Sequence, residues 1–223
     1  FKVAFSETIR DSSFVKKSEF KLVRTKNILE KEDIDVFGIM LNKLIRNKIG
    51  LIEFQNNCQH NSYTYVYDFN TVLEIPQKIL KPNSIDIIIT SPPYGDSKTT
   101  VAYGQYSRLS NEWLGYRNAN QIDKKLMGGE KIKENFSFKS SVLNDVINTI
   151  QKIDKKRALD VISFYNDYIN SINNISKTLK KNGFVCYVVG NRTVKSINIP
   201  NDEITAQIFE NNNFEHIETI VRN

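Results

Sequence analysis

The spacing of hydrophobic residues changes several times along the chain between the period of a helix and that of a strand. Apolar residues recur every three or four positions over 33–48 and 158–181, which predicts two amphipathic helices. Nearly continuous apolar runs fill 85–89 and 184–191, as is typical of buried strands in a parallel sheet. Helices and strands that alternate in this way predict an α/β fold.

Weaker patterns fill the rest of the chain. Residues 64–70 are β-prone and predict a strand, followed by a short helix over 71–80. A helix is expected over 199–211, with Pro200 near its start, and an alternating, half-exposed strand over 214–222. The stretch that begins at Gly95 is polar and aromatic with little period, so we expect a loop there.

These elements divide the chain into four consecutive regions. Residues 1–50 form a linking segment and a helix, and 64–94 form a strand–helix–strand unit. Residues 95–157 form a loop and a polar insertion, in which 142–153 has helical spacing. Residues 158–223 form a helix–strand–helix–strand unit, so the predicted order is that of one α/β domain.

Composition narrows the functional classes. The 223 residues are 40% hydrophobic, which is enough for a sizeable core, and the net charge of +6 is compatible with a polyanionic partner. Cys58 and Cys186 lie far apart and outside any Cys/His cluster, so neither a disulfide framework nor a zinc site is expected. No apolar run has the length of a membrane span, and we expect a cytoplasmic protein with no membrane partner.

A stiff turn follows the strand predicted over 85–89. The sequence there is Thr90 followed by Ser91-Pro92-Pro93-Tyr94. Neither proline has an N–H for strand pairing, and each fixes its own φ and restrains the residue before it. Open α/β sheets place their ligands at the carboxyl ends of such strands, so this turn is the candidate site.

Ser-Pro-Pro-Tyr at the end of a buried strand resembles the motif of the DNA amino-methyltransferases. The resemblance implies a Rossmann-like, S-adenosylmethionine-dependent methyltransferase sheet, of which this chain is the catalytic half with a polar insertion after the catalytic loop. It also implies methyl transfer to the exocyclic amine of a base flipped out of double-stranded DNA, as in restriction-modification systems. A cognate restriction endonuclease is then a further possible partner.

The chemistry of the turn agrees with that activity. An exocyclic amine is a poor nucleophile, and acceptors on its hydrogens, here the Ser91 hydroxyl and the Pro92 carbonyl, favour a more tetrahedral nitrogen. Pro93 stiffens the turn, which is catalysis by positioning, and the Tyr94 ring offers a face for the base. The alternative is an ordinary proline-rich turn in which Tyr94 only packs.

The resemblance also implies cofactor-binding residues. The acid that ends the strand before the catalytic one helps to hold the adenine end of the cofactor, and Asp68 lies at about that distance. Tyr67 replaces the glycine usual before this acid, and Asp68 has the alternative of a helix N-cap or turn aspartate. Thr90 and Ser91 are the other cofactor candidates.

Residues on either side of the turn are candidates for contacts with DNA. Tyr103 and Tyr106 are stacking or wedge candidates, whereas for Trp113 we favour anchoring of the loop on the core. The other candidates are polar or charged residues of the loop and residues at the end of the second strand: Asp96, Lys98, Arg108, Gly190 and Asn191. The insertion is a candidate for target recognition, and surface elaboration is the alternative.

A glycine-rich loop for the cofactor is missing from the sequence. Methyltransferases of this kind place such a loop after a strand, but these nine glycines include no Gly-x-Gly. Since the chain begins at Phe1 and its first residues, Ala4-Phe5-Ser6-Glu7-Thr8, resemble a segment that follows the cofactor half, we expect an upstream segment or a second chain to carry the loop. Alone, the chain should bind S-adenosylmethionine poorly.

The target base is less constrained than the reaction. In the family, Ser before Pro-Pro-Tyr goes more often with N4 of cytosine, and Asp or Asn with N6 of adenine, so Ser91 favours cytosine. Methylation of cytosine C5 is disfavoured because neither cysteine follows a proline. The remaining alternatives are a non-catalytic DNA-recognition subunit that retains the fold, and methylation of RNA or of a protein glutamine.

Overall fold

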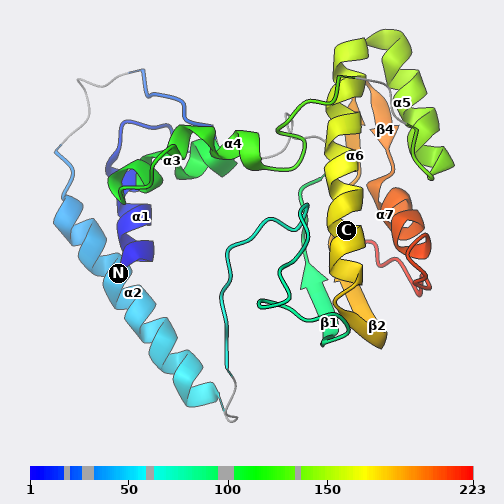
Figure 1. The fold of residues 1–223 in the computed structure, drawn as a ribbon. Helices are drawn as coiled ribbons and strands as arrows, with labels where there is room; N and C mark the ends of the chain where they lie inside the picture. Colours follow the sequence, from blue (N-terminus) through cyan, green and yellow to red (C-terminus); the bar gives the residue numbers. More distant parts are fainter. Residues whose placement is uncertain (18–20, 27–32, 59–62, 95–102, 134–136, 223) are drawn as a thin grey trace. The chain divides into compact units, whose positions relative to one another are not determined.

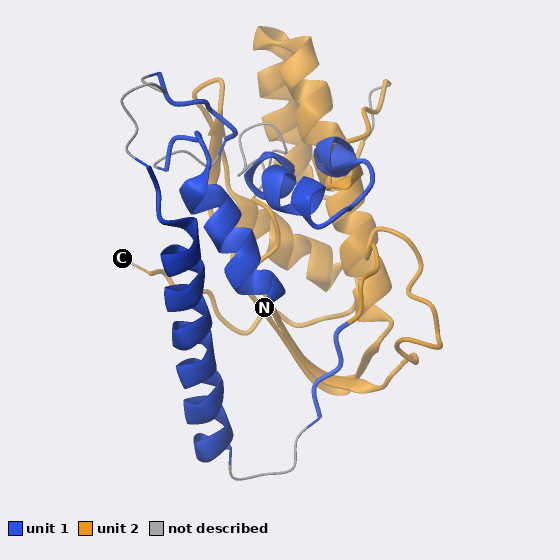
Figure 2. Ribbon diagram, turned by 90° about the vertical axis from the view of Figure 1, so that its left-hand side faces the viewer, with its two compact units in different colours: residues 1–66, 101–123 blue, residues 67–100, 124–223 orange. Residues whose placement is uncertain are grey.

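The computed structural model describes residues 1–17, 21–26, 33–58, 63–94, 103–133 and 137–222. The chain forms two compact units, which Figure 2 colours separately. Unit 1 comprises residues 1–66 and 101–123, and unit 2 comprises residues 67–100 and 124–223. Both units are built from segments that are distant in the sequence.

Unit 1 is helical. Helix α1 (Lys2–Ser12) packs against α2 (Val36–Asn57) and α3 (Tyr103–Trp113), and α3 packs against the short helix η1 (Ala119–Gln121), which is followed by α4 (Ile122–Lys125). The helix expected over 33–48 is confirmed but extends to Asn57, because Gly50 does not end it. One glycine costs a helix only about 1 kcal/mol, which the other residues of a long helix can outweigh.

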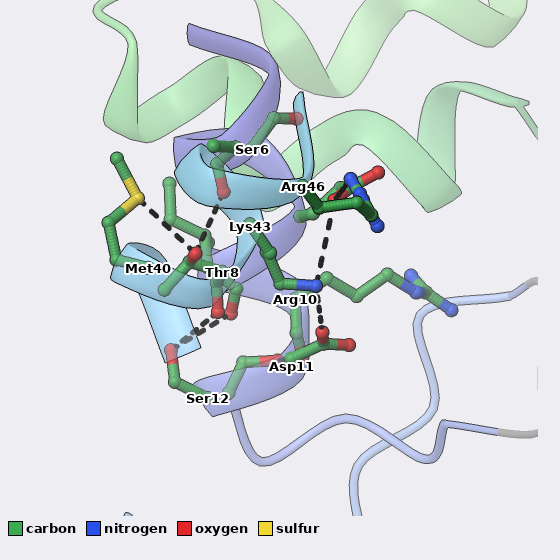
Figure 3. Close-up of polar contacts among 12 residues, drawn as sticks. Ser6, Thr8, Arg10, Asp11, Ser12, Met40, Lys43 and Arg46 are labelled. Atoms are coloured by element: carbon green, nitrogen blue, oxygen red, sulfur yellow. Dashed lines mark hydrogen bonds and ion pairs between the residues drawn. The ribbon is translucent and has the colours of Figure 1, made fainter. Parts of the chain in front are cut away.

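Charged side chains join α1 to α2 (Figure 3). The Lys43 ammonium lies 2.6 Å from an Asp11 carboxylate oxygen, and Arg46 donates to Glu7 over 2.6 Å. The pKa of Lys43 is raised above the usual lysine value, and the hydrogen bond from Lys43 to Asp11 is the largest cause. These contacts fix the polar side of α2, whereas Leu41, Ile45 and other apolar side chains of this helix are exposed.

Unit 2 contains the sheet. Strand β1 (Ile85–Thr90) pairs in parallel with β2 (Leu179–Tyr187), and α6 (Lys155–Ser176) runs back between them in sequence (Figure 1). Helices α5 (Ser141–Ile153) and α7 (Asn201–Glu210) pack with α6 around the core, whose largest fully buried side chains include Tyr165, Tyr168 and Phe164. The predicted α/β class and the parallel pair of strands are confirmed.

The two strands are covered on one side only among the described residues. Val185 and Tyr187 of β2 pack against the helical core, whereas Ile87, Ile89 and Phe184 are 53%, 70% and 60% exposed. The prediction of strands buried on both faces was therefore wrong for this chain. Cys186 of β2 is exposed on the open face.

The end of α6 also differs from the prediction. The helix stops at Ser176 rather than at Lys181, and Lys180 to Gly183 belong to β2 as a bulge between the pairs Ile85–Leu179 and Ile87–Phe184. Asn182 has a φ of 64°, and a Cβ at Gly183 would lie 2.9 Å from the Asp86 carbonyl oxygen. Asn-Gly thus allows a close approach of two strands and does not end the helix.

Three further predictions of local structure were wrong. Residues 64–70 and 214–222 are not strands, and 71–80 contains turns in place of a helix. A β-prone segment becomes a strand only when a neighbour pairs with it, and no described strand lies beside either segment. The loop expected after the motif contains α3, and an unpredicted hairpin joins β3 (Arg192–Val194) to β4 (Ile197–Ile199).

Other structural signals are lacking in the described part of the chain. None of its helices is long and apolar enough to cross a membrane. It also contains no group of three or more His, Cys, Asp or Glu side chains that could hold a metal ion.

Candidate active site

The Ser-Pro-Pro-Tyr turn leaves the sheet where β1 and β2 end together. The Val188 N–H donates to the Thr90 carbonyl over 2.9 Å, so the pairing of the two strands continues up to the residue before the motif. Ser91 is exposed, and the following two prolines and Tyr94 are half-buried. A rigid pair of strands therefore positions a short turn that begins with an accessible hydroxyl group.

Side-chain contacts hold the turn closed. The Ser91 and Tyr94 hydroxyl oxygens lie 3.0 Å apart, within hydrogen-bonding distance. The Tyr94 ring lies over Gly190, where an added Cβ would be 3.4 Å from the ring. The structure thus brings together three predicted site residues, Ser91, Tyr94 and Gly190, from the ends of the two paired strands.

Asn191 lies next to this group, and its side chain has a structural partner. Its Oδ1 accepts a hydrogen bond from the Asp202 N–H over 3.2 Å, in the first turn of α7. No side chain of Pro200, the N-cap residue, can serve the free N–H groups there, so Asn191 acts as a cap from outside the helix. The contact fixes the end of β2 relative to α7.

The candidate cofactor residues form only a partial set. Asp68 is exposed in an irregular segment, and the carbonyl of Thr90 already accepts the Val188 N–H. Gly190, which follows β2, has its Cα side occupied by the Tyr94 ring. The described residues therefore do not fit a complete S-adenosylmethionine site, because Asp68 has no strand to position it and they include no Gly-x-Gly loop.

The candidate DNA-binding residues after the motif are divided between described and undescribed positions. Asp96 and Lys98 lie outside the described residues. Tyr103, Tyr106 and Arg108 lie on α3 of unit 1, and Arg108 forms an ion pair of 2.8 Å with Glu112. The Arg10 guanidinium lies 3.9 Å from the Tyr106 ring centroid, so one face of that ring has a protein partner.

An aromatic and a basic side chain of unit 1, Trp113 and Arg10, have exposures that the sequence does not indicate. Trp113 was expected to anchor a loop on the core, but it is 71% exposed at the end of α3. Arg10 is buried, and its guanidinium donates to the Tyr106 carbonyl. Their sequence neighbourhoods give no signal for either outcome, because both depend on contacts between distant segments.

One anchored segment of unit 2 was missed altogether. Residues 128–132 are fixed to α6 by Asp160, Ser163 and Asp167, which accept from the Lys131 ammonium, the Ile132 N–H and the Gly128 N–H, respectively. The signal was present as polar residues spaced by three and four on a helix that is otherwise largely apolar on that side.

Comparison with known proteins bears on this arrangement. Over its whole length the chain is 36% identical to "Type II methyltransferase M.MvaI" of Kocuria varians. The chain is related to the DNA methyltransferases of restriction-modification systems. This relationship supports the restriction-modification methyltransferase family and implies S-adenosylmethionine as the methyl donor, whereas the amino-methyltransferase type inferred from Ser-Pro-Pro-Tyr stays a prediction.

The extent of the match also matters. The chain spans about half of the length of this methyltransferase, 52%. No protein-family model matches the chain, and no solved structure matches it.

Proposed function

We propose that this chain forms the target-base half of a DNA amino-methyltransferase that modifies N4 of cytosine. The observation that carries the proposal is the closed turn, in which Ser91, Tyr94 and Gly190 meet at the carboxyl end of a parallel strand pair. The relationship to a Type II methyltransferase supports the same reaction. The Rossmann-like sheet is part of this proposal, with β1 and β2 as two of its strands.

The residues of the turn would hold the amine rather than react with it. The Ser91 hydroxyl and the Pro92 carbonyl accept its two hydrogens, which directs the nitrogen lone pair away from the ring of the base. Tyr94, kept over Gly190, offers its ring to the flipped base. Because the Ser91 and Tyr94 hydroxyl groups lie 3.0 Å apart, a base that enters would exchange or extend a hydrogen bond already present.

The cofactor side of the reaction is proposed to come from outside the described residues. Asp68, Thr90 and Ser91 would contribute at most the edge of that site, and a glycine-rich loop from another segment or chain would complete it. S-adenosylmethionine supplies the methyl group when bound. Double-stranded DNA is the proposed substrate, and a restriction endonuclease of the same specificity is a proposed partner.

Methyl transfer to mixed-sequence duplex DNA tests the proposal. The chain is assayed alone and together with a polypeptide that carries a glycine-rich cofactor loop, and the digested nucleosides are identified by mass spectrometry. We expect N4-methylcytosine only in the combined reaction. N6-methyladenine would contradict the choice of base and leave the role of the turn intact.

The competing function is a DNA-recognition subunit without catalysis, which the partial cofactor set favours. Folded protein that binds DNA but produces no methylated nucleoside in either reaction would support that alternative. A micromolar affinity of the isolated chain for S-adenosylmethionine in calorimetry would argue against both a missing cofactor loop and a purely structural subunit.

A further inference from the structure

Two helices of unit 2 begin at the same edge of the sheet but with opposite charges. Helix α7 carries Asp202 and Glu203 in its first turn, where negative charge complements the helix dipole. Helix α6 is capped by Asp154, whose side chain accepts from the Arg157 N–H, but its first turn has no acid and consists of Lys155, Lys156 and Arg157. Positive charge at that position opposes the dipole, and although Arg157 pairs with Asp160, helix stability does not explain Lys155 and Lys156.

This edge is the one that carries the Ser-Pro-Pro-Tyr turn. Helix α6 leads directly into β2 at its C-terminus, and β2 is parallel to β1, so the start of α6 lies towards the carboxyl ends of both strands (Figure 1). The first turn of α6 and the motif therefore belong to the same side of unit 2. The turn of the β3–β4 hairpin also reaches it, because Lys195 forms a 3.0 Å ion pair with Asp154.

A second basic segment runs towards the same helix end. The Gly128 N–H is bound to Asp167, whereas Ile132 and Lys131 are bound to Ser163 and Asp160, one and two turns closer to the start of α6. The segment therefore runs along α6 towards the start of that helix, and Lys133 continues in the direction of Lys155 and Lys156. All three of these lysines are exposed.

The anchoring of this segment is unusually strong for an exposed loop. Asp160 is 2% exposed, and its two oxygens receive the Lys131 ammonium at 2.7 Å and the Arg157 guanidinium at 2.9 Å. Met127 and Ile132 pack against the core on either side. The segment is thus fixed in place, while its next lysine is left in solvent.

The local charges add up to an excess of positive charge over α6. The basic groups are Lys131, Lys133, Lys155, Lys156, Arg157 and Lys195, and the acidic groups among them are Glu130, Asp154 and Asp160. Two of these acids form the ion pairs with Lys131, Arg157 and Lys195. Three lysines, Lys133, Lys155 and Lys156, and one acid, Glu130, lie outside these pairs, so positive charge is in excess. On the α7 side of the edge the charge is negative, from Asp202 and Glu203.

We infer that Lys133, Lys155 and Lys156 form a basic rim that binds the phosphate backbone of duplex DNA beside the target base. The inference rests on the proposed function for its choice of polyanion. Fixed lysines on one side of the turn and carboxylates on the other would direct the duplex over α6 and away from α7. The rim would then set the position of the duplex, while recognition of the base is left to the turn.

The test is binding of the 223-residue chain to a duplex oligonucleotide by fluorescence anisotropy over a range of salt concentrations. A triple variant of the rim, Lys133→Gln, Lys155→Gln and Lys156→Gln, is compared with Lys81→Gln, Lys177→Gln and Lys181→Gln. The control lysines are exposed and lie at the opposite end of β1, α6 and β2. Their substitution removes the same charge as the rim variant does. Circular dichroism verifies that both variants keep the fold.

We expect the rim variant to bind at least about tenfold more weakly at moderate salt. The slope of log K against log salt should become shallower by roughly 0.9 for each phosphate that the variant no longer neutralises. The control should change less than about twofold. Equal reductions in affinity for the two variants, or a wild-type chain that does not bind duplex DNA, would overturn the inference.

Methyl transfer separates this inference from the proposed function. If methyl transfer depends on Tyr94 but the affinity for DNA does not depend on Lys133, Lys155 and Lys156, the rim alone is overturned. Binding that depends on the rim, without any methylated nucleoside in the combined reaction, would uphold the rim and contradict the proposed activity.

Discussion

The two faces of the β1–β2 sheet carry similar side chains in different surroundings. On one face, Val185 and Tyr187 pack against α6 and α7, and the ring centroids of Tyr187 and Phe209 are 5.0 Å apart. On the other, Ile87, Ile89 and Phe184 are at least half exposed. Apolar residues along a strand therefore indicate that both of its faces can be covered. They do not indicate which part of a protein covers each face.

The two faces also differ in whether the sequence predicts the elements that cover them. The covered face is bounded by helices whose amphipathic pattern is visible in the sequence, above all α6. The open face includes Val188 and Cys186 and has no described element over it. A mutation on the covered face should therefore lower the free energy of unfolding far more than a mutation on the open face.

The largest effect should come from a matched pair of phenylalanines. Phe164 is fully buried between α6 and the core, whereas Phe184 is 60% exposed on the open face. Phe164→Ala should lower the free energy of unfolding by about 3–5 kcal/mol, because it leaves a cavity in a packed core. Phe184→Ala should cost less than about 1 kcal/mol. Urea denaturation measures both, and similar decreases would show that the open face is covered in solution.

The core on the covered face contains buried tyrosines, so the free energy of unfolding should depend on alkaline pH. Burial raises the pKa of Tyr165, Tyr168 and Tyr187 well above the ordinary value of 10.0. Below pH 10 these phenols are protonated in both states, so their contribution is complete. Above it the unfolded chain loses protons first, and the free energy of unfolding falls as the pH rises.

Absorbance of tyrosinate during a pH titration measures this effect. Of the ten tyrosines in the chain, these three should ionise only together with unfolding followed by circular dichroism. Tyr187→Phe is the control and should reduce that step from three groups to two. Ionisation of all tyrosines before any unfolding would contradict a covered face with buried phenols.

The smallest effect concerns a thiol on the open face. Cys186 is exposed there, and Cys58 is exposed at the end of α2. In a Cys58→Ser variant, Cys186 should react with a thiol reagent at a rate within about tenfold of that of the unfolded chain, because native structure does not bury it. Cys186→Ser gives the matched rate for Cys58. Protection of Cys186 in the native chain would place a further element over β2.

The sequence predicted those elements that carry their own pattern. The β1 and β2 strands, α6 and α7 were predicted because long apolar runs or a 3.6-residue period marks each of them. Helix α3 was missed because Gly104, Ser107 and Asn111 are poor helix formers. It is stabilised by distant contacts, such as the bonds from the Gly104 N–H to Asp123 and from Ser110 to the Ser6 carbonyl.

The candidate site was predicted in part for similar reasons. Ser91 and Tyr94 were found because a chemically specific motif ends a strand, and Gly190 because its strand was expected beside β1. The cap that Asn191 provides to α7 and the anchoring of Lys131 by Asp160 depend on residues 11 and 29 positions away, which no local pattern connects. Asp68 lacks the strand that was expected to position it.

The central claim is that the closed turn acts on the amine of a flipped base. Its most direct test is the rate of methyl transfer by the chain in the combined reaction, compared among wild type, Ser91→Ala and Tyr94→Phe. Removal of the Ser91 acceptor should lower kcat by about tenfold or more, because one hydrogen bond to the reacting amine is no longer made. Tyr94→Phe keeps the ring and should have a smaller effect. Wild-type rates for Ser91→Ala, with N4-methylcytosine still produced, would contradict the claim.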